Sequence, residues 1–214
     1  MKKVDYSLMF VTDDRITDDD LFINILEASL KGGATIIQLR EKNLDTKAFF
    51  SRAKKVKHIC KKYEVPFIIN DRIDIALAVD ANGVHLGQKD LPITVARKLL
   101  GKDKIIGLSV SNTKEALDAN NQEIDYVGIS PIFGTATKTK DLEKPLGLDG
   151  LIKIKEISSK ILICIGGINK ENAVKIIQNG ADGIAVISAI SQATNSEKAT
   201  KTLKNCACQI GTKK

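Results

Sequence analysis

Short runs of apolar and β-branched residues alternate with longer amphipathic segments along the whole chain. The apolar runs predict strands at residues 6–12, 35–40, 66–70, 84–86, 105–109, 126–130, 160–165 and 183–188. The segments between them have helical spacing and predict helices at residues 21–30, 46–63, 71–81, 92–100, 114–120, 151–157, 173–179 and 198–207. Eight strand–helix units of about 27 residues each favour an α/β fold of the closed (β/α)8 type, a TIM barrel, over an open doubly wound sheet.

Nothing in the composition divides the chain, so we expect residues 1–214 to form a single TIM-barrel catalytic domain. With 43% hydrophobic and 28% charged residues, the composition is typical of a soluble globular protein. The apolar runs are shorter than a membrane span, and the N-terminal segment lacks the features of a signal peptide. We therefore expect a cytoplasmic location and no membrane partner.

The formal net charge of +7 could indicate a nucleic-acid partner or an anionic small substrate. Many of the lysines, however, lie on the predicted surface of one helix or in the segment 201–214, and no basic stripe with interleaved aromatic residues accompanies them. We expect small-molecule substrates and no nucleic acid. The outer helices of a barrel leave the formation of a homo-oligomer open.

The four cysteines lack the paired spacing of a zinc site, and Cys164, inside an apolar run, is expected to fill the core. Metal binding by Cys206 and Cys208 is disfavoured, and their role stays open.

In a TIM barrel, the residues that follow the strands meet at one rim and form the active site. The predicted strand ends carry polar, charged and glycine residues, namely Gln38, Arg40, Lys42, Asn70, Asp71, Asp90, Ser109, Thr135, Thr137, Lys138, Gly166, Gly167 and Ser188. Asp71 and Asp90 offer the oxygen ligands of Mg2+, which proteins often hold through one or two carboxylates beside substrate phosphates and waters. Arg40, Lys42 and Lys138 can neutralise anionic oxygens directly.

The second half of the chain offers backbone groups rather than charges. Gly166 and Gly167 precede a predicted helix, and a turn follows at residues 187–189. Their N–H groups can bind a monophosphate, and in barrels the loops after strands seven and eight often do so. The connection at residues 131–150 is unusually long, which is typical of functional loops.

Each of these signals also has a structural explanation. Asn70 or Asp71 could cap the next helix, and Asp90 could belong to a helix start. Residues 40–42 could form a solvated ion-pair cluster, and residues 135–140 a plain polar loop. His85, inside the fourth predicted strand, is more typical of a core histidine than of a catalyst. The sequence lacks a Ser-His-Asp or Cys-His pattern, which disfavours nucleophilic catalysis.

Seven motifs resemble those of the thiamine phosphate synthase family over essentially the full length of the chain. They are QLREK at 38–42, ND at 70–71, GVHLGQKD at 83–90, GLSVSN at 107–112, ISPIFGTATK at 129–138, IGGI at 165–168 and GADGIAVISAI at 180–190. The resemblance implies a Mg2+-dependent transferase of thiamine biosynthesis. Such an enzyme condenses hydroxymethylpyrimidine diphosphate with hydroxyethylthiazole phosphate, and the products are thiamine phosphate and pyrophosphate.

Carried over position by position, the resemblance implies a role for each matching residue. The pyrimidine diphosphate would be bound by Gln38, Leu39, Arg40, Glu41, Lys42, Asn70, Ser109 and Lys138. Of these, Arg40, Lys42, Ser109 and Lys138 would be catalytic, while Asp71 and Asp90 would hold Mg2+. The thiazole phosphate would be bound by Thr135, Ala136, Thr137, Gly167, Ile187 and Ser188. The departures from the family pattern are small: Met9, Ser130 and Gly134 replace an aromatic residue, glycine and proline.

Two alternatives remain at this point. The related thiazole tautomerases share the barrel and the thiazole phosphate site but are isomerases, which could dispense with the diphosphate cluster. The presence of Arg40, Lys42, Asp71, Asp90 and Lys138 favours the synthase. A non-catalytic sensor would bind the same two ligands without turnover.

Overall fold

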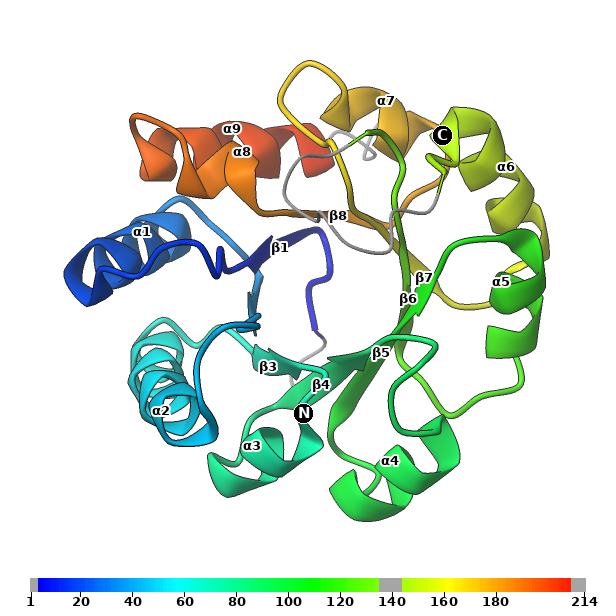
Figure 1. Ribbon diagram of the computed structural model, residues 1–214. Coiled ribbons are helices and arrows are strands. Elements are labelled where there is room, and N and C mark those ends of the chain that lie inside the picture. The colour runs from blue at the N-terminus through cyan, green and yellow to red at the C-terminus, as the bar shows by residue number, and fades with distance from the viewer. Residues whose placement is uncertain (1–3, 135–143, 209–214) are drawn as a thin grey trace.

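A computed structural model describes residues 4–134 and 144–208, and within them eight parallel strands close into a barrel (Figure 1). The strands are β1 (Leu8–Val11), β2 (Ile36–Leu39), β3 (Phe67–Asn70), β4 (Gly83–Leu86), β5 (Ile105–Val110), β6 (Tyr126–Ile129), β7 (Ile161–Cys164) and β8 (Gly183–Val186). They follow one another around the barrel in sequence order, and β8 pairs with β1. The predicted (β/α)8 TIM barrel is confirmed.

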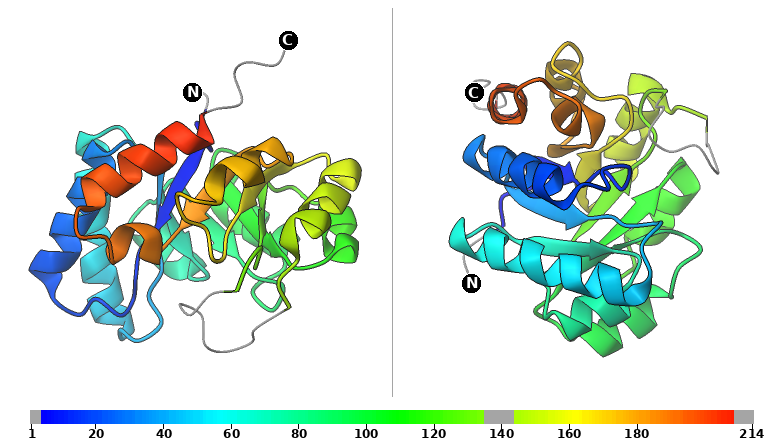
Figure 2. Two further views of the ribbon diagram at one scale, coloured as in Figure 1. Left: turned by 90° about the horizontal axis from the view of Figure 1, so that it is seen from above. Right: turned by 60° about the vertical axis from the view of Figure 1, so that its left-hand side comes forward.

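The helices form a ring around the barrel, as Figures 1 and 2 show. They are α1 (Asp19–Lys31), α2 (Thr46–Lys62), α3 (Ile73–Ala78), α4 (Ile93–Leu100), α5 (Thr113–Ala119), α6 (Gly147–Ile157), α7 (Ala173–Gln178), α8 (Ser188–Ser191) and α9 (Ser196–Ala207). No helix in residues 4–134 and 144–208 is long and apolar enough to cross a membrane.

Most boundaries shift by one or two residues from the sequence prediction, and three of the differences concern segments at the rim of the barrel. The helix expected at 71–81 begins at Ile73, because Asp71 has a left-handed backbone (φ +61°) that cannot continue into a helix. The sixth helix begins at Gly147 rather than at residue 151, since the N–H groups of Leu146 and Gly147 bond to the loop after β6. The eighth strand ends at Val186, and the short α8 follows it directly.

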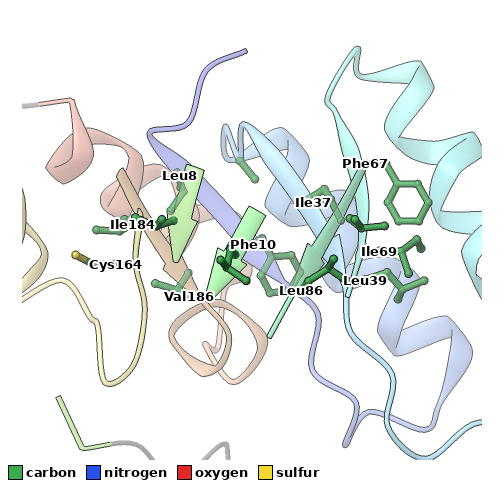
Figure 3. Packing of buried hydrophobic residues seen from close by; sticks show 14 of the residues in the cluster. Leu8, Phe10, Ile37, Leu39, Phe67, Ile69, Leu86, Cys164, Ile184 and Val186 are labelled. Atoms are coloured by element: carbon green, nitrogen blue, oxygen red, sulfur yellow. The ribbon is translucent and has the colours of Figure 1, made fainter. Parts of the chain in front are cut away.

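Alternate residues of each strand enter two different cores, because successive side chains of a strand point to opposite faces. The outer core fills the space between barrel and helices, and it includes the residues labelled in Figure 3, such as Leu8, Phe10 and Ile37. The inner core fills the barrel itself with Met9, Val11, Ile36, Ile68, Ile105, Tyr126, Ile163 and Ala185.

Two glycines make room for large rings inside the barrel. A Cβ at Gly107 would lie 2.1 Å from Tyr126 Cζ, and a Cβ at Gly128 would lie 2.8 Å from His85 Cε1. Both distances are far below van der Waals contact, so these strand positions require glycine. The rings of Tyr126 and His85 therefore occupy the middle of the barrel and close the bottom of the cavity above them.

Candidate active site

A cavity of about 880 Å³ lies at the carboxyl ends of the strands and is lined by residues from all eight strands and from the segments that follow β2 to β8. Eleven of the residues that the sequence singled out line it, namely Gln38, Arg40, Lys42, Asn70, Asp71, Asp90, Ser109, Gly166, Gly167, Ile187 and Ser188. Segments from residue 38 to residue 188 thus converge on one site. Thr135, Ala136, Thr137 and Lys138 lie outside the described residues, and their roles stay predictions.

Two residues of the QLREK motif have side chains that face away from this cavity. Leu39 is fully buried in the outer core. The Glu41 carboxylate accepts a 2.9 Å hydrogen bond from Arg52 Nη1, and burial raises the pKa of Glu41 against the opposing effect of Arg52. The in–out alternation of β2 continues past its end, so only Gln38, Arg40 and Lys42 present side chains to the cavity. Leu39 and Glu41 could contact a ligand through the main chain alone.

Asp71 and Asp90 are held by backbone contacts at the rim. The Asp71 N–H donates a 2.8 Å hydrogen bond to the His85 carbonyl, and its carboxylate contacts Lys42 Nζ. The Asp90 carboxylate accepts a 2.6 Å hydrogen bond from the Gly87 N–H. Neither residue caps a helix: the N-cap positions of α3 and α4 are Arg72 and Pro92, without side-chain bonds. The capping explanation for Asp71 is therefore wrong.

The two carboxylates are close enough to influence each other. Burial raises the pKa of Asp90, the hydrogen bond from Gly87 lowers it, and the charge and hydrogen bond of Asp71 raise it further. Two mutually repelling carboxylates at an open rim fit a divalent cation. Within residues 4–134 and 144–208, no group of three or more His, Cys, Asp or Glu could hold a metal.

The basic residues on the side of β2 to β4 are held by hydrogen bonds, and some of their N–H donors have no partner in the described part of the chain. Arg40 Nη1 donates a 2.6 Å hydrogen bond to Asp14, and the Arg40 main-chain N–H donates to Thr12 Oγ1. The remaining guanidinium N–H groups have no partner in the described part of the chain, which leaves them for an anion. Asn70, at the end of β3, likewise has a side-chain amide without a hydrogen-bond partner among the described residues.

The floor of the cavity is polar but uncharged. Gln38 Nε2 lies 3.2 Å from Met9 Sδ, and the His85 ring bonds to Tyr126 and Ser109. Burial lowers the pKa of His85 to about 4, with Asp71 acting in the opposite direction, so the imidazole is neutral at pH 7. Both ring nitrogens of His85 are therefore hydrogen-bonded within the barrel, and the residue also lines the cavity.

Several residues that line the cavity were not predicted from the sequence, among them Tyr126, Gln88 and Glu115. A signal for Tyr126 was present, because the alternation of β6 places it on the inner face, as the alternation of β4 and β5 does for His85 and Ser109.

The opposite side of the cavity is built from backbone. Gly166 and Gly167 have φ values of +105° and +65°, which favour glycine. A Cβ at Gly167 would lie 2.5 Å from the Gly134 carbonyl oxygen, and the Gly166 carbonyl accepts a 3.0 Å hydrogen bond from the Phe133 N–H. The loops after β6 and β7 are thus packed backbone to backbone, which only glycine allows.

The first turn after β8 completes this side. Ile187 and Ser188 line the cavity at the start of α8. The buried Asp13, just after β1, accepts a 2.8 Å hydrogen bond from Ser191 Oγ and so ties α8 to the first strand. Burial raises the pKa of Asp13, but the hydrogen bonds from Arg15 and Ser191 lower it more, and the net shift is downward.

Comparison with known proteins places this arrangement in a family. Residues 8–190 match the family model described as thiamine monophosphate synthase. The thiamine-phosphate synthase of Clostridium novyi (strain NT) is 50% identical over 205 residues, covering 94% of this chain and 98% of the relative. That of Clostridium botulinum (strain 657 / Type Ba4) is 51% identical over 188 residues, covering 88% of this chain and 91% of the relative.

A solved structure agrees with the sequence relatives. Thiamine phosphate pyrophosphorylase from Pyrococcus furiosus superimposes with a TM-score of 0.85 at 39% sequence identity, covering 95% of this chain and 96% of that one. Orotidine 5'-phosphate decarboxylase from Pyrococcus horikoshii has a TM-score of 0.68 at 16% identity, a likeness of fold alone. The chain therefore belongs to the thiamine monophosphate synthase family of transferases, which serve thiamine biosynthesis.

Proposed function

We propose that this enzyme condenses hydroxymethylpyrimidine diphosphate with hydroxyethylthiazole phosphate, giving thiamine phosphate and pyrophosphate. One observation carries the proposal: the cavity has two unlike anion-binding sides. Charged groups that suit a diphosphate, with Arg40, Lys42, Asp71 and Asp90, face a backbone turn that suits a monophosphate, at Gly167 and Ser188. The two substrates have these two kinds of phosphate.

In the proposed reaction, the bond between the exocyclic methylene carbon and the diphosphate oxygen breaks, and its electron pair leaves with pyrophosphate. The aminopyrimidine ring delocalises the resulting positive charge, and the lone pair of the thiazole nitrogen then forms the new carbon–nitrogen bond. A protein nucleophile is not required. The protein acts by binding the leaving group and by holding the two rings in line.

Arg40 and Lys42, with Asn70, would bind the diphosphate oxygens, and Lys138 is proposed to join them. Arg40 has N–H groups, and Asn70 a side-chain amide, that find no partner within residues 4–134 and 144–208, and this supports the assignment because such donors are available to a ligand. Lys42 contacts Asp71 and would exchange this partner for a phosphate oxygen.

Asp71 and Asp90 would hold Mg2+, which when bound neutralises negative charge on the departing pyrophosphate. The repulsion between the two carboxylates supports this role, since a cation between them removes it. The pair by itself would also repel a diphosphate, so a bound cation is what makes the rim receptive to that substrate.

The thiazole phosphate would lie on the opposite side, against the N–H groups of Gly167, Ile187 and Ser188, together with residues Thr135, Ala136 and Thr137. The uncharged floor with Gln38 and Ser109 would take the aminopyrimidine ring. A cytoplasmic location, small-molecule partners and the absence of nucleic-acid binding stay predictions.

The decisive experiment mixes the enzyme with both substrates, with and without Mg2+, and measures pyrophosphate and thiamine phosphate. We expect equal amounts of the two products, formed only with Mg2+. Omitting the thiazole phosphate separates coupling from hydrolysis of the diphosphate. Binding of both ligands without release of pyrophosphate would indicate a sensor, and no release under any condition overturns the proposal.

A further inference from the structure

A buried hydrogen-bonded chain connects the interior of the barrel with the cavity. His85 Nδ1 lies 2.8 Å from the Tyr126 hydroxyl, and His85 Nε2 lies 2.9 Å from Ser109 Oγ. The His85 and Tyr126 rings stack with centroids 5.5 Å apart. Tyr126 is 1% exposed, whereas Ser109 is only partly buried. All three residues line the cavity, and because Tyr126 is almost fully buried, Ser109 is the end of the chain that is more open to a ligand.

The protons of these three side chains can be arranged in two ways, because a neutral imidazole has one N–H donor and one acceptor nitrogen. In the first arrangement Tyr126 donates to Nδ1, and Nε2–H donates to Ser109, which keeps its own proton free. In the second, Ser109 donates to Nε2, and Nδ1–H donates to Tyr126, whose proton is left without an acceptor.

Burial decides between the two arrangements. Within residues 4–134 and 144–208, neither the Tyr126 nor the Ser109 hydroxyl has another hydrogen-bond partner. The second arrangement would leave the O–H of the almost fully buried Tyr126 without an acceptor, which is unfavourable. The first leaves the spare proton on Ser109, where water or a ligand accepts it.

We propose that Tyr126 and His85 are positioning residues that fix Ser109 as a hydrogen-bond donor toward the ligand on the floor of the cavity. The acceptor would be a nitrogen of an electron-rich aromatic ring. This choice of ligand rests on the proposed function, whereas the proton arrangement itself does not. A neutral hydroxyl can orient such a ring without placing a positive charge beside the cation that forms on it.

The first test measures the tautomer of His85 in the enzyme without substrates. The sequence contains two histidines, His58 and His85, so a spectrum of the 15N-labelled enzyme shows the ring nitrogens of two imidazoles. The variant His58→Gln, on the exposed face of α2, assigns them. We expect His85 to be protonated at Nε2 and to accept at Nδ1. Protonation at Nδ1 overturns the proposal, whether or not the enzyme makes thiamine phosphate.

The second test is a double-mutant cycle with Tyr126→Phe and Ser109→Ala. Tyr126→Phe keeps the ring but removes the donor, and we expect kcat/KM for the pyrimidine diphosphate to fall about tenfold, with KM for the thiazole phosphate unchanged. In the Ser109→Ala background the same change should cost nothing further. An equal loss in both backgrounds would show that Tyr126 acts through packing, and would overturn the proposal.

A wild-type enzyme that releases no pyrophosphate would contradict the proposed function instead. The tautomer measurement would then decide the proton arrangement alone. Thermal unfolding of both single variants, expected within a few degrees of wild type, excludes a loss of fold as the cause of the kinetic change.

Discussion

The two sides of the cavity are built from different chemical parts. On the side of β2 to β4, charged side chains do the binding, and they are held in ion pairs such as Arg40 with Asp14 and Lys42 with Asp71. On the side of β6 to β8, none of the described residues that line the cavity is charged, and the loop after β7 is shaped by Gly166 and Gly167. The first side would therefore bind a ligand through charged side chains, and the second through main-chain N–H groups whose positions the fold of the loops sets.

This difference predicts how each side responds to change. Charges on long side chains can exchange partners when a ligand arrives, so their removal should affect binding and turnover more than folding. A backbone surface has its N–H groups fixed by the packing of two loops, so a change there should affect stability and affinity together.

The largest effect is expected for Asp71→Asn. Loss of one carboxylate weakens Mg2+ binding and leaves the pyrophosphate charge less neutralised, so kcat/KM for the pyrimidine diphosphate should fall by about 10²–10³-fold. Steady-state kinetics at several Mg2+ concentrations would measure this. Asp74→Asn, which removes an exposed partner of Arg72 nearby, is the matched control and should stay near wild type. Coupling rates within a few-fold of wild type for Asp71→Asn would refute the leaving-group role.

A second variant tests whether Glu41, in the QLREK motif, stabilises the fold rather than binds substrate. Glu41→Gln removes the buried charged partner of Arg52, which keeps its ion pair with Asp19 and a 3.5 Å hydrogen bond to the Ile16 carbonyl, and should lower the free energy of unfolding by about 2 kcal/mol. Activity at 25 °C should change less than about threefold, because the Glu41 side chain faces the helices. Denaturant unfolding and kinetics test both parts, with the exposed Glu171→Gln as control. A large loss of activity without a loss of stability would place Glu41 in the site.

On the backbone side, Gly167→Ala should affect stability and affinity together. Its Cβ would lie 2.5 Å from the Gly134 oxygen at a φ of +65°, so we expect a loss of about 1–2 kcal/mol from the left-handed backbone and a roughly tenfold higher KM for the thiazole phosphate. Gly147→Ala is the control, since Gly147 has a φ of +63° with no atom within 4 Å of a Cβ. It should lose only the stability that the left-handed backbone costs, less than Gly167→Ala loses, and should keep the wild-type KM. Equal KM values in both variants would contradict a shaped phosphate site.

The smallest effect is a pH dependence at the anchor of α8. The lowered pKa of Asp13 means that its carboxylate form is favoured in the folded state. Its stabilisation of about 1 kcal/mol should be present above the unfolded pKa near 3.9 and be lost as the pH falls through the lower folded value. Asp13→Asn should therefore be less stable than wild type at pH 6. The difference in the free energy of unfolding between the two proteins should decrease toward pH 3. Denaturant unfolding at both pH values measures this, with Asp118→Asn as an exposed control. If the difference in the free energy of unfolding were the same at pH 3 and pH 6, the ionisation of Asp13 would not contribute to stability.

The same contrast explains how much of the site could be predicted from the sequence. Charged residues after apolar runs are visible in a linear pattern, and Arg40, Lys42, Asp71 and Asp90 all line the cavity. The glycine side gave a weaker signal, because a glycine pair occurs in many turns. That position 167 requires glycine follows only from its packing against Phe133 and Gly134 in the folded chain.

From the sequence alone we could predict the closed barrel and the order of all its strands and helices except the short α8, since hydrophobic periodicity is a local property that any window of the chain contains. The sequence also located the rim, because parallel strands bring their carboxyl ends to one side. The tertiary structure decided which side chains of the QLREK motif face the cavity, and that Asp71 takes a left-handed backbone instead of capping α3.

Only the tertiary structure joins His85, Ser109 and Tyr126, which come from three strands. The strand register places His85 beside Gly107 and Ser109 beside Gly128, so that two glycines open the space in which the rings meet. The physical reason is that strand register is set by packing around the whole barrel, whereas each residue's preference for strand or helix is set by its neighbours in sequence.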